Sequence, residues 1–213
     1  PSASRWIHVG DRGCDNFEFY AQCRTTGTDF LVRVAQDRRA ALGHEAQEST
    51  GLLLQLARQL PAAGKKTLTL RTRPKRKARE AQLSVAWAQM TVFPPWLNRE
   101  AIDPLPVWVV RVWETNSPPD EEPIEWVLIT SVPVANAATA LEVADWYALR
   151  WLVEEYHKCL KTGCSAEQRQ LEEVERLRAC LALLAVTAVR LLQLKLVARD
   201  HPTRPAMQGA PAG

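Results

Sequence analysis

The chain has 213 residues, of which 46% are hydrophobic and 24% charged, and its formal net charge is +3. This length and composition predict one sizeable globular domain, or one domain with an insertion, and exclude an intrinsically disordered chain. Because the net charge is small, an argument for nucleic-acid binding must rest on local clusters of charge. The five cysteines form no CxxC pair and are odd in number, which disfavours a zinc site and a disulfide framework.

The first predicted element is a buried strand at residues 6–10, WIHVG, which ends at Asp11. It begins within a few residues of Pro1 and no Met precedes it, so we expect the sequence to be a fragment of a longer protein. An acid at the carboxyl end of a central strand projects into the crevice where ligands collect. Asp11 could instead cap the helix predicted at residues 15–24, although Asp15 is the better cap candidate. The spacing alone leaves both roles open.

A strand over residues 28–35, TDFLVRVA, carries Arg33, and a strand Arg is more often a paired edge residue than a ligand. A short helix is predicted over residues 49–59. The densest basic run follows, with eight cations before the first acid: Lys65, Lys66, Arg71, Arg73, Lys75, Arg76, Lys77 and Arg79. Its flanks alternate and predict two strands joined by a basic tip, which is either a nucleic-acid patch or an exposed hairpin.

Further strands are predicted at residues 107–114 and 125–131, so residues 65–131 form a mostly antiparallel sheet. The chain has eight tryptophans, and we expect most of them in the core. The long helix predicted over residues 171–199 is apolar from 177 to 196 and is expected to be buried against the core. Its longest uncharged run, residues 179–189, is shorter than the roughly 20 residues of a membrane span, so none is predicted.

Residues 147–161, YALRWLVEEYHKCLK, form the most informative stretch. On a regular helix Tyr147, Arg150, Glu154 and Lys161 fall within about 60° of one another, and the apolar residues lie nearly opposite. Such a stripe is usually a solvated face, and an i,i+4 ion pair contributes only about 0.2–0.5 kcal/mol. A carboxylate that suits a hard cation, flanked by groups that bind phosphate oxygens, nevertheless indicates nucleic-acid chemistry.

The spacing Tyr147-x2-Arg150-x3-Glu154-x6-Lys161 resembles the Tyr-Arg-Glu-Lys signature of bacterial insertion-sequence transposases with an Asp-Asp-Glu catalytic core, the hairpin-forming cut-and-paste group. The resemblance extends through HKCLKTG, through AVRLLQLK at 188–195 and through WVLITSVPV at 126–134. It implies a ribonuclease H-like α/β core, incomplete at its N-terminus, with an inserted mostly antiparallel β subdomain and C-terminal helices. The expected division is 1–60 core, 61–132 insertion, 133–200 core helices and 201–213 disordered tail.

The resemblance also implies roles for individual residues. Asp11, in VGDRG, matches the second catalytic Asp, and Glu154 matches the catalytic Glu. Both would bind metal in a two-metal site for Mg²⁺ or Mn²⁺. The DNA-binding residues would be Tyr147, Arg150 and Lys161 as phosphate contacts, Arg33 from its strand, and Trp126, whose counterpart stacks on a base flipped out of the transposon end.

The implied substrate is double-stranded DNA, at transposon ends and at the target. We expect a cytoplasmic bacterial protein that does not bind membranes and whose full-length form is a transposase homodimer. The family's first Asp has no counterpart, because no Asp precedes Asp11. We therefore expect the polypeptide to be inactive alone. The alternatives are a non-catalytic truncated product that binds DNA or a full-length transposase, and a relic without a stable fold.

Overall fold

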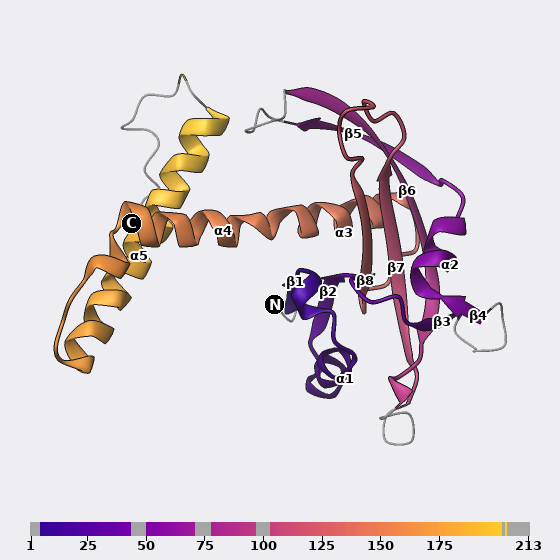
Figure 1. Ribbon diagram of the computed structural model, residues 1–213, viewed down its shortest axis with the longest axis horizontal. Coiled ribbons are helices and arrows are strands. Elements are labelled where there is room, and N and C mark those ends of the chain that lie inside the picture. The colour runs from indigo at the N-terminus through magenta and orange to yellow at the C-terminus, as the bar shows by residue number, and fades with distance from the viewer. Residues whose placement is uncertain (1–4, 44–49, 71–77, 97–102, 202, 204–213) are drawn as a thin grey trace. The chain divides into compact units, whose positions relative to one another are not determined.

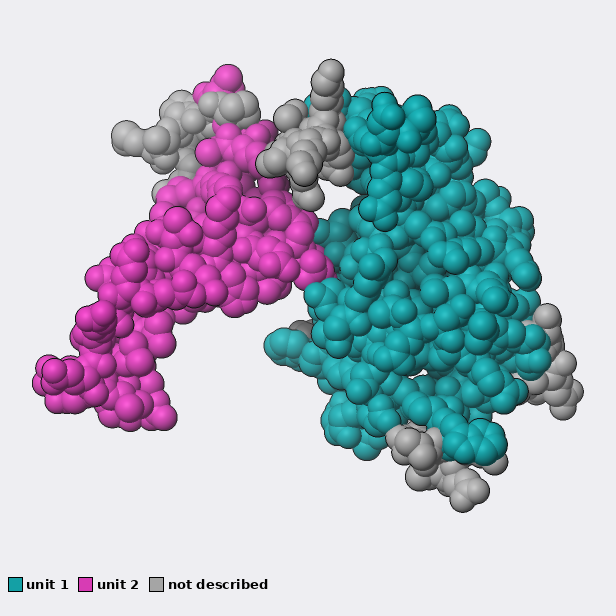
Figure 2. Space-filling model, in the orientation of Figure 1, with its two compact units in different colours: residues 1–149 teal, residues 150–213 magenta. Residues whose placement is uncertain are grey.

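The computed structural model describes residues 5–43, 50–70, 78–96, 103–201 and 203 (Figure 1). The chain divides into two compact units, residues 1–149 and residues 150–213, which Figure 2 shows in different colours. Each unit is described separately below. The predicted boundaries at residues 60 and 132 stay a prediction, and the predicted tail lies almost wholly outside the described residues.

Unit 1 is built on one mixed sheet, whose described strands follow the order β1-β2-β8-β7-β6-β3-β4, with β5 also paired to β6. The strands are β1 Ile7–Gly10, β2 Asp29–Arg33, β3 Arg39–Leu42, β4 Thr50–Leu52, β5 Gly64–Leu70, β6 Arg79–Val92, β7 Leu105–Glu114 and β8 Glu125–Thr130. β1 and β2 are parallel, whereas β8 runs antiparallel to β2. A parallel pair needs a crossover connection, and α1 (Phe17–Thr26) provides it.

The predicted strands are present, and the predicted hairpin is confirmed because β5 and β6 pair antiparallel from Gly64↔Val85 to Leu70↔Arg79. Its basic tip, residues 71–77, lies outside the described residues. β6, β7 and β8 are antiparallel neighbours, and β8 joins them to β2. The antiparallel strands therefore continue the same sheet that contains β1. The short helix predicted over residues 49–59 begins later, at Leu53, because β4 occupies residues 50–52.

The two faces of the sheet bury separate hydrophobic clusters, because alternate strand residues point to opposite faces. The first core holds Phe30 and Val32 of β2 with residues of α1 and of α2 (Leu53–Gln59). The second core holds Leu31 of β2 with residues of α3 (Ala137–Leu149). α2 and α3 accordingly lie on opposite sides of the strands (Figure 1). Each fully buried Leu, Val or Phe contributes roughly 1.5–3 kcal/mol.

Helix α1 begins later than predicted, and Asn16 is its cap. The Asn16 Oδ1 accepts hydrogen bonds from the Glu18 amide at 2.8 Å and the Phe19 amide at 3.4 Å. Asp15 was the predicted cap, and this prediction is wrong. The helix ends at Gly27, whose φ of 68° is left-handed and lets the Thr28 amide bond to the Cys23 carbonyl at 3.0 Å.

Asp15 is instead a buried carboxylate that joins two segments of the chain. Its Oδ1 accepts from the Tyr20 hydroxyl at 2.6 Å, and its Oδ2 accepts from the Ala35 and Gln36 amides at 2.6 and 2.8 Å. Arg38 forms an ion pair with it, and the Asp15 side chain is only 1% exposed. Burial, followed by the bond to Asp15, raises the pKa of Tyr20 and keeps its hydroxyl a donor. Asp15 thus ties the start of α1 to the segment that follows β2.

Unit 2 is a helical hairpin. α4 (Trp151–Lys158) continues into a π-helical turn, Cys159–Gly163, and α5 (Val174–Asp200) returns alongside them. Glu155 pairs with Lys195, and the Arg199 guanidinium lies 5.3 Å from the centre of the Trp151 ring. After the π-helical turn, Ser165 has the left-handed φ of 52° and precedes a short 3-10 turn at Ala166–Gln168.

The expectation that α5 is buried is wrong for the described structure. Ala188 is its only buried residue, because α4 and the π-helical turn are too short to cover the whole helix. Seven large apolar residues of α5 are exposed: Val174, Leu181, Leu183, Val186, Val189, Leu191 and Leu194. With 27 residues, α5 is also long and apolar enough to cross a membrane, by length and composition only. The predicted absence of any such segment is therefore not supported.

The Asp15 network predicts a large loss of stability when its carboxylate is removed. Asp15→Ala leaves the buried Arg38 guanidinium without its ion pair and should lower the free energy of unfolding of unit 1 by about 3–5 kcal/mol. Tyr20→Phe removes one hydrogen bond and should cost only about 1 kcal/mol. Urea unfolding followed by circular dichroism measures both. Equal, small losses in the two variants would show that Asp15 does not hold these segments together.

Candidate functional site

Three of the predicted site residues lie at one edge of the sheet, where β1 and β2 end and β8 begins. Gly10 and Val32 are the last residue pair of the parallel ladder between β1 and β2. Asp11 and Arg33 are the residues that follow them in the chain. Arg33 in turn pairs with Leu128 of β8. Trp126 lies two residues before Leu128 at the start of β8. The register therefore brings Asp11, Arg33 and Trp126 to the same edge of unit 1.

Asp11 is exposed and occupies the tight turn that follows β1. Its Oδ1 accepts a hydrogen bond of 2.8 Å from the Gly13 amide and caps the short 3-10 turn Arg12–Cys14. Gly10 makes this turn possible, since a Cβ at residue 10 would lie 2.5 Å from the Cys14 Cβ. Of the two roles that the sequence left open, the cap of α1 belongs to Asn16 and not to Asp11. Asp11 caps a turn, and its carboxylate is on the surface at the strand end.

Arg33 is half-buried, and its Nη2 donates to the Glu125 carbonyl at 2.9 Å. The Glu125 side chain is bound by two further arginines, since Oε2 accepts from Arg58 Nη2 at 2.8 Å and Oε1 lies 2.9 Å from Arg111 Nη2. Its hydrogen bonds with Arg58, more than any other contact, hold the pKa of Glu125 below its usual range. A cluster of guanidinium groups therefore surrounds the start of β8.

Sequence reasoning missed Arg12, Arg58, Arg111 and Glu125. These residues come from four separate elements, and no motif or local spacing connects them. Only the strand register and the packing of α2 on the sheet bring them together. By contrast, two cations of the predicted basic run are tied into the fold: Lys66 pairs with Asp145, and Arg79 pairs with Glu114 and Glu121.

Trp126 contacts Tyr147, the last predicted site residue in unit 1. The two ring centroids are 5.3 Å apart at an interplanar angle of 66°, an edge-to-face arrangement. Tyr147 is only 7% exposed and belongs to the second core, whereas Trp126 is half-buried and packs against it. Trp126 is thus partly a core residue, and part of its surface is accessible at the sheet edge.

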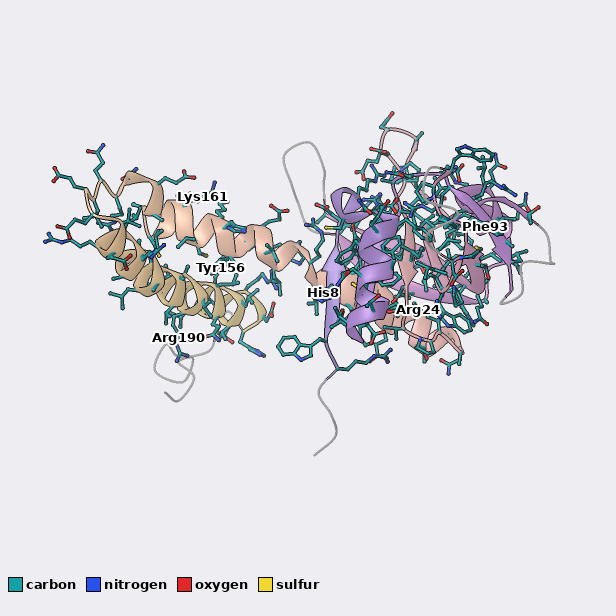
Figure 3. All side chains as sticks on the ribbon, turned by 90° about the horizontal axis from the view of Figure 1, so that it is seen from below. His8, Arg24, Phe93, Tyr156, Lys161 and Arg190 are labelled. Atoms are coloured by element: carbon teal, nitrogen blue, oxygen red, sulfur yellow. The ribbon has the colours of Figure 1, made fainter. Side chains whose placement is uncertain are left out.

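The remaining signature residues lie in unit 2. Arg150 precedes α4, and its Nη1 donates to the Glu154 Oε1 at 3.2 Å. Glu154 is well exposed, with 66% of its side chain accessible. Lys161 lies in the π-helical turn and is labelled in Figure 3. Its Nζ is 2.7 Å from the Glu167 Oε1, and this contact raises the pKa of Lys161.

The predicted stripe on one regular helix needs correction. Tyr147 lies in the last turn of α3, Arg150 lies between α3 and α4, and Lys161 lies in a turn with wider i→i+5 winding. The angles of a 3.6-residue helix therefore do not apply to Lys161. The expectation that this helix buries its apolar side is also wrong, because α4 has no buried residue and Leu149 and Val153 are 57% and 53% exposed.

Within the described residues, no group of three or more His, Cys, Asp or Glu side chains lies together in a way that could hold a metal ion. Asp11 and Glu154 are exposed carboxylates in different units. Their oxygen atoms are the ligand type that hard cations such as Mg²⁺ and Mn²⁺ prefer, so the donor chemistry of the two residues fits such an ion.

Residues 7–190 match the family model described as the transposase DDE domain. The match includes both predicted carboxylates, Asp11 and Glu154, and covers most of the 213 residues. Domains of this kind generally use divalent metal ions and act on DNA. The mixed α/β fold of unit 1 agrees with a ribonuclease H-like domain. The chain belongs to the transposase DDE domain family.

Proposed function

We propose that the chain is the catalytic part of a DNA transposase of the hairpin-forming cut-and-paste group, acting on transposon ends in the bacterial cytoplasm. The observation that carries the proposal is the sheet edge of unit 1. Asp11, Arg33 and Trp126 come from three distant parts of the sequence, and the strand register brings them to this edge. An acid, a guanidinium and an indole are the groups needed for a hard cation, a phosphate and a base.

Asp11 and Glu154 are the proposed metal ligands. When bound, the ions would supply an activated water or 3′ hydroxyl and stabilise the leaving oxygen of an in-line attack at phosphorus. Arg150 donates a hydrogen bond to Glu154, and its other N–H groups can donate to a phosphate oxygen. Asp11 and Glu154 match two of the three carboxylates that the resemblance implies. We expect them to bind Mn²⁺ weakly.

This assignment predicts that Mn²⁺ binding depends on both carboxylates. Asp11→Ala and Glu154→Ala should each weaken Mn²⁺ binding at least about tenfold, because changes even to the outer residues around a metal cost about 10–100-fold. Isothermal titration calorimetry measures the affinity.

Glu155→Ala is the matched control, since Glu155 lies beside Glu154 in α4 but pairs with Lys195. Its Mn²⁺ affinity should equal that of the unchanged protein. Equal Mn²⁺ affinity in all four proteins would remove the metal-ligand role of Asp11 and Glu154.

The DNA-binding residues have complementary roles in the proposal. Tyr147, Arg150 and Lys161 bind backbone phosphates, as does Arg33 from β2. Trp126 holds a base that is turned out of the duplex while the hairpin forms. Its edge-to-face contact with Tyr147 holds the indole in one orientation. A base can therefore stack on the accessible part of the ring with little further loss of side-chain conformational entropy.

The stacking role predicts a selective loss of affinity. Trp126→Ala should weaken binding to a duplex end with one unpaired base by about tenfold, because base–aromatic stacking contributes about 1–3 kcal/mol. Binding to the same end with an abasic site should change little. Fluorescence anisotropy of labelled DNA measures both affinities.

Trp87→Ala is the control, because Trp87 of β6 is also half-buried against the second core. Both variants should lose similar stability in urea, and only Trp126→Ala should distinguish the two DNA ends. If Trp126→Ala weakens binding to intact and abasic ends alike, Trp126 acts through packing and not through stacking.

A further inference from the structure

A hollow of about 420 Å³ opens at the sheet edge of unit 1 and is lined by Arg12, the residue after Asp11. Three arginines from three elements line it: Arg12 from the 3-10 turn, Arg33 from the end of β2 and Arg58 from α2. Glu125 is the acid in its wall. The remaining walls are apolar and consist of Val34, Ala35, Leu54 and Val127. The hollow thus has three positive charges and one negative charge in its lining, and its other walls are apolar.

The three guanidinium groups have more N–H donors than the residues that line the hollow have acceptors. Each Arg carries five N–H donors. Arg33 donates to the Glu125 carbonyl, and Arg58 donates to the Glu125 carboxylate. Arg12 is exposed and lines the same hollow. A ligand with several acceptor oxygens and a negative charge matches this arrangement.

The Arg58–Glu125 ion pair can exchange for such a ligand. The two side chains are 54% and 30% exposed, and exposed pairs contribute only about 0–1 kcal/mol. Glu125 keeps a second partner, because the more buried Arg111 also holds its carboxylate and donates to the Arg58 carbonyl at 2.9 Å. Arg58 can therefore turn to a phosphate while Glu125 stays bound to Arg111.

The hollow lies on the opposite face of β8 from the Trp126 ring. Val127, in its wall, belongs to the first core, whereas Trp126 packs against the second core. Glu125 and Trp126 are nevertheless adjacent in the chain, and Arg12 is adjacent to Asp11. A DNA strand that reaches both Asp11 and Trp126 must pass this edge, and its backbone carries one phosphate per nucleotide.

We propose that the hollow binds a backbone phosphodiester of the transposon-end strand, with Arg12, Arg33 and Arg58 as ligands and Glu125 holding Arg58 until the phosphate arrives. The inference rests on the proposed DNA-transposing function. It adds Arg12 and Arg58 as phosphate ligands and Glu125 as a competitor for the same site. Arg–phosphate bonds are charge-assisted and often bidentate, as the bonds from Arg58 to Glu125 are, so a phosphate can take the place of the carboxylate at Arg58.

The competitor role predicts opposite effects of two substitutions. Arg58→Ala should weaken binding to a duplex end about tenfold and lower the slope of log affinity against log salt concentration by about one unit. Glu125→Gln removes a negative charge beside the phosphate and should tighten binding about fivefold. Fluorescence anisotropy at several chloride concentrations gives affinity and slope, and urea unfolding gives stability.

Arg24→Ala is the matched control, since Arg24 is an exposed arginine of α1 outside the hollow (Figure 3). If Arg58 and Glu125 only stabilise the fold, both substitutions lower stability and neither changes the salt slope more than Arg24→Ala does. That result overturns the phosphate site but leaves DNA binding by the chain intact. An unchanged protein that binds no DNA end overturns the proposed function together with the site.

A second arm locates the phosphate in the DNA. Neutral methylphosphonates replace the phosphates of the end strand one at a time. A methylphosphonate at one position near the unpaired base should weaken DNA binding by the unchanged protein but not by the Arg58→Ala variant. The absence of any such position would also overturn the proposal.

Discussion

The arrangement of the sheet edge depends on the buried carboxylate of Asp15. Its oxygens accept bonds from Tyr20 at the start of α1 and from the amides of Ala35 and Gln36 just after β2. The chain leaving β1 is thereby tied to the chain leaving β2. Asp11 and Arg33 precede the two segments that Asp15 holds together. The buried Asp15 carboxylate therefore helps to position the exposed Asp11 carboxylate relative to the half-buried Arg33 guanidinium. Arg38 supplies the compensating charge without which burial of the carboxylate would be costly.

Charge compensation governs the rest of the edge as well. Glu125 accepts from Arg58 and Arg111, so much of the positive charge at the start of β8 is already balanced within unit 1. In unit 2 Arg150 lies against Glu154, and Lys161 lies against Glu167. The pairs in unit 2 are exposed, and exposed pairs contribute only about 0–1 kcal/mol each. Under the proposed function, the same guanidinium and ammonium groups exchange these weak partners for the phosphates of DNA.

The sequence predicts the strands well because hydrophobic alternation and short apolar runs are local signals, as in WIHVG before Asp11 and EWVLIT at β8. The roles of the signature residues, whose spacing is a pattern within one segment, stay a prediction. The sequence does not predict features that depend on residues far apart in the chain. Asp15 and Asn16 carry equal local cap signals, and only the amides of Ala35 and Gln36 make Asp15 the buried one. Likewise, no residue spacing in the sequence indicates the π-helical turn at Lys161 or the arginines around Glu125.

The proposed metal-ligand roles of Asp11 and Glu154 can be tested by metal-directed protein cleavage. Fe²⁺ replaces Mg²⁺ at oxygen-rich sites and, with ascorbate and peroxide, cuts the backbone near the bound ion. If both residues are metal ligands, cuts should occur near Asp11 and near Glu154, and excess Mg²⁺ should suppress both. Cuts near only one of the two residues, or cuts that excess Mg²⁺ leaves unchanged, would show that the assignment is wrong.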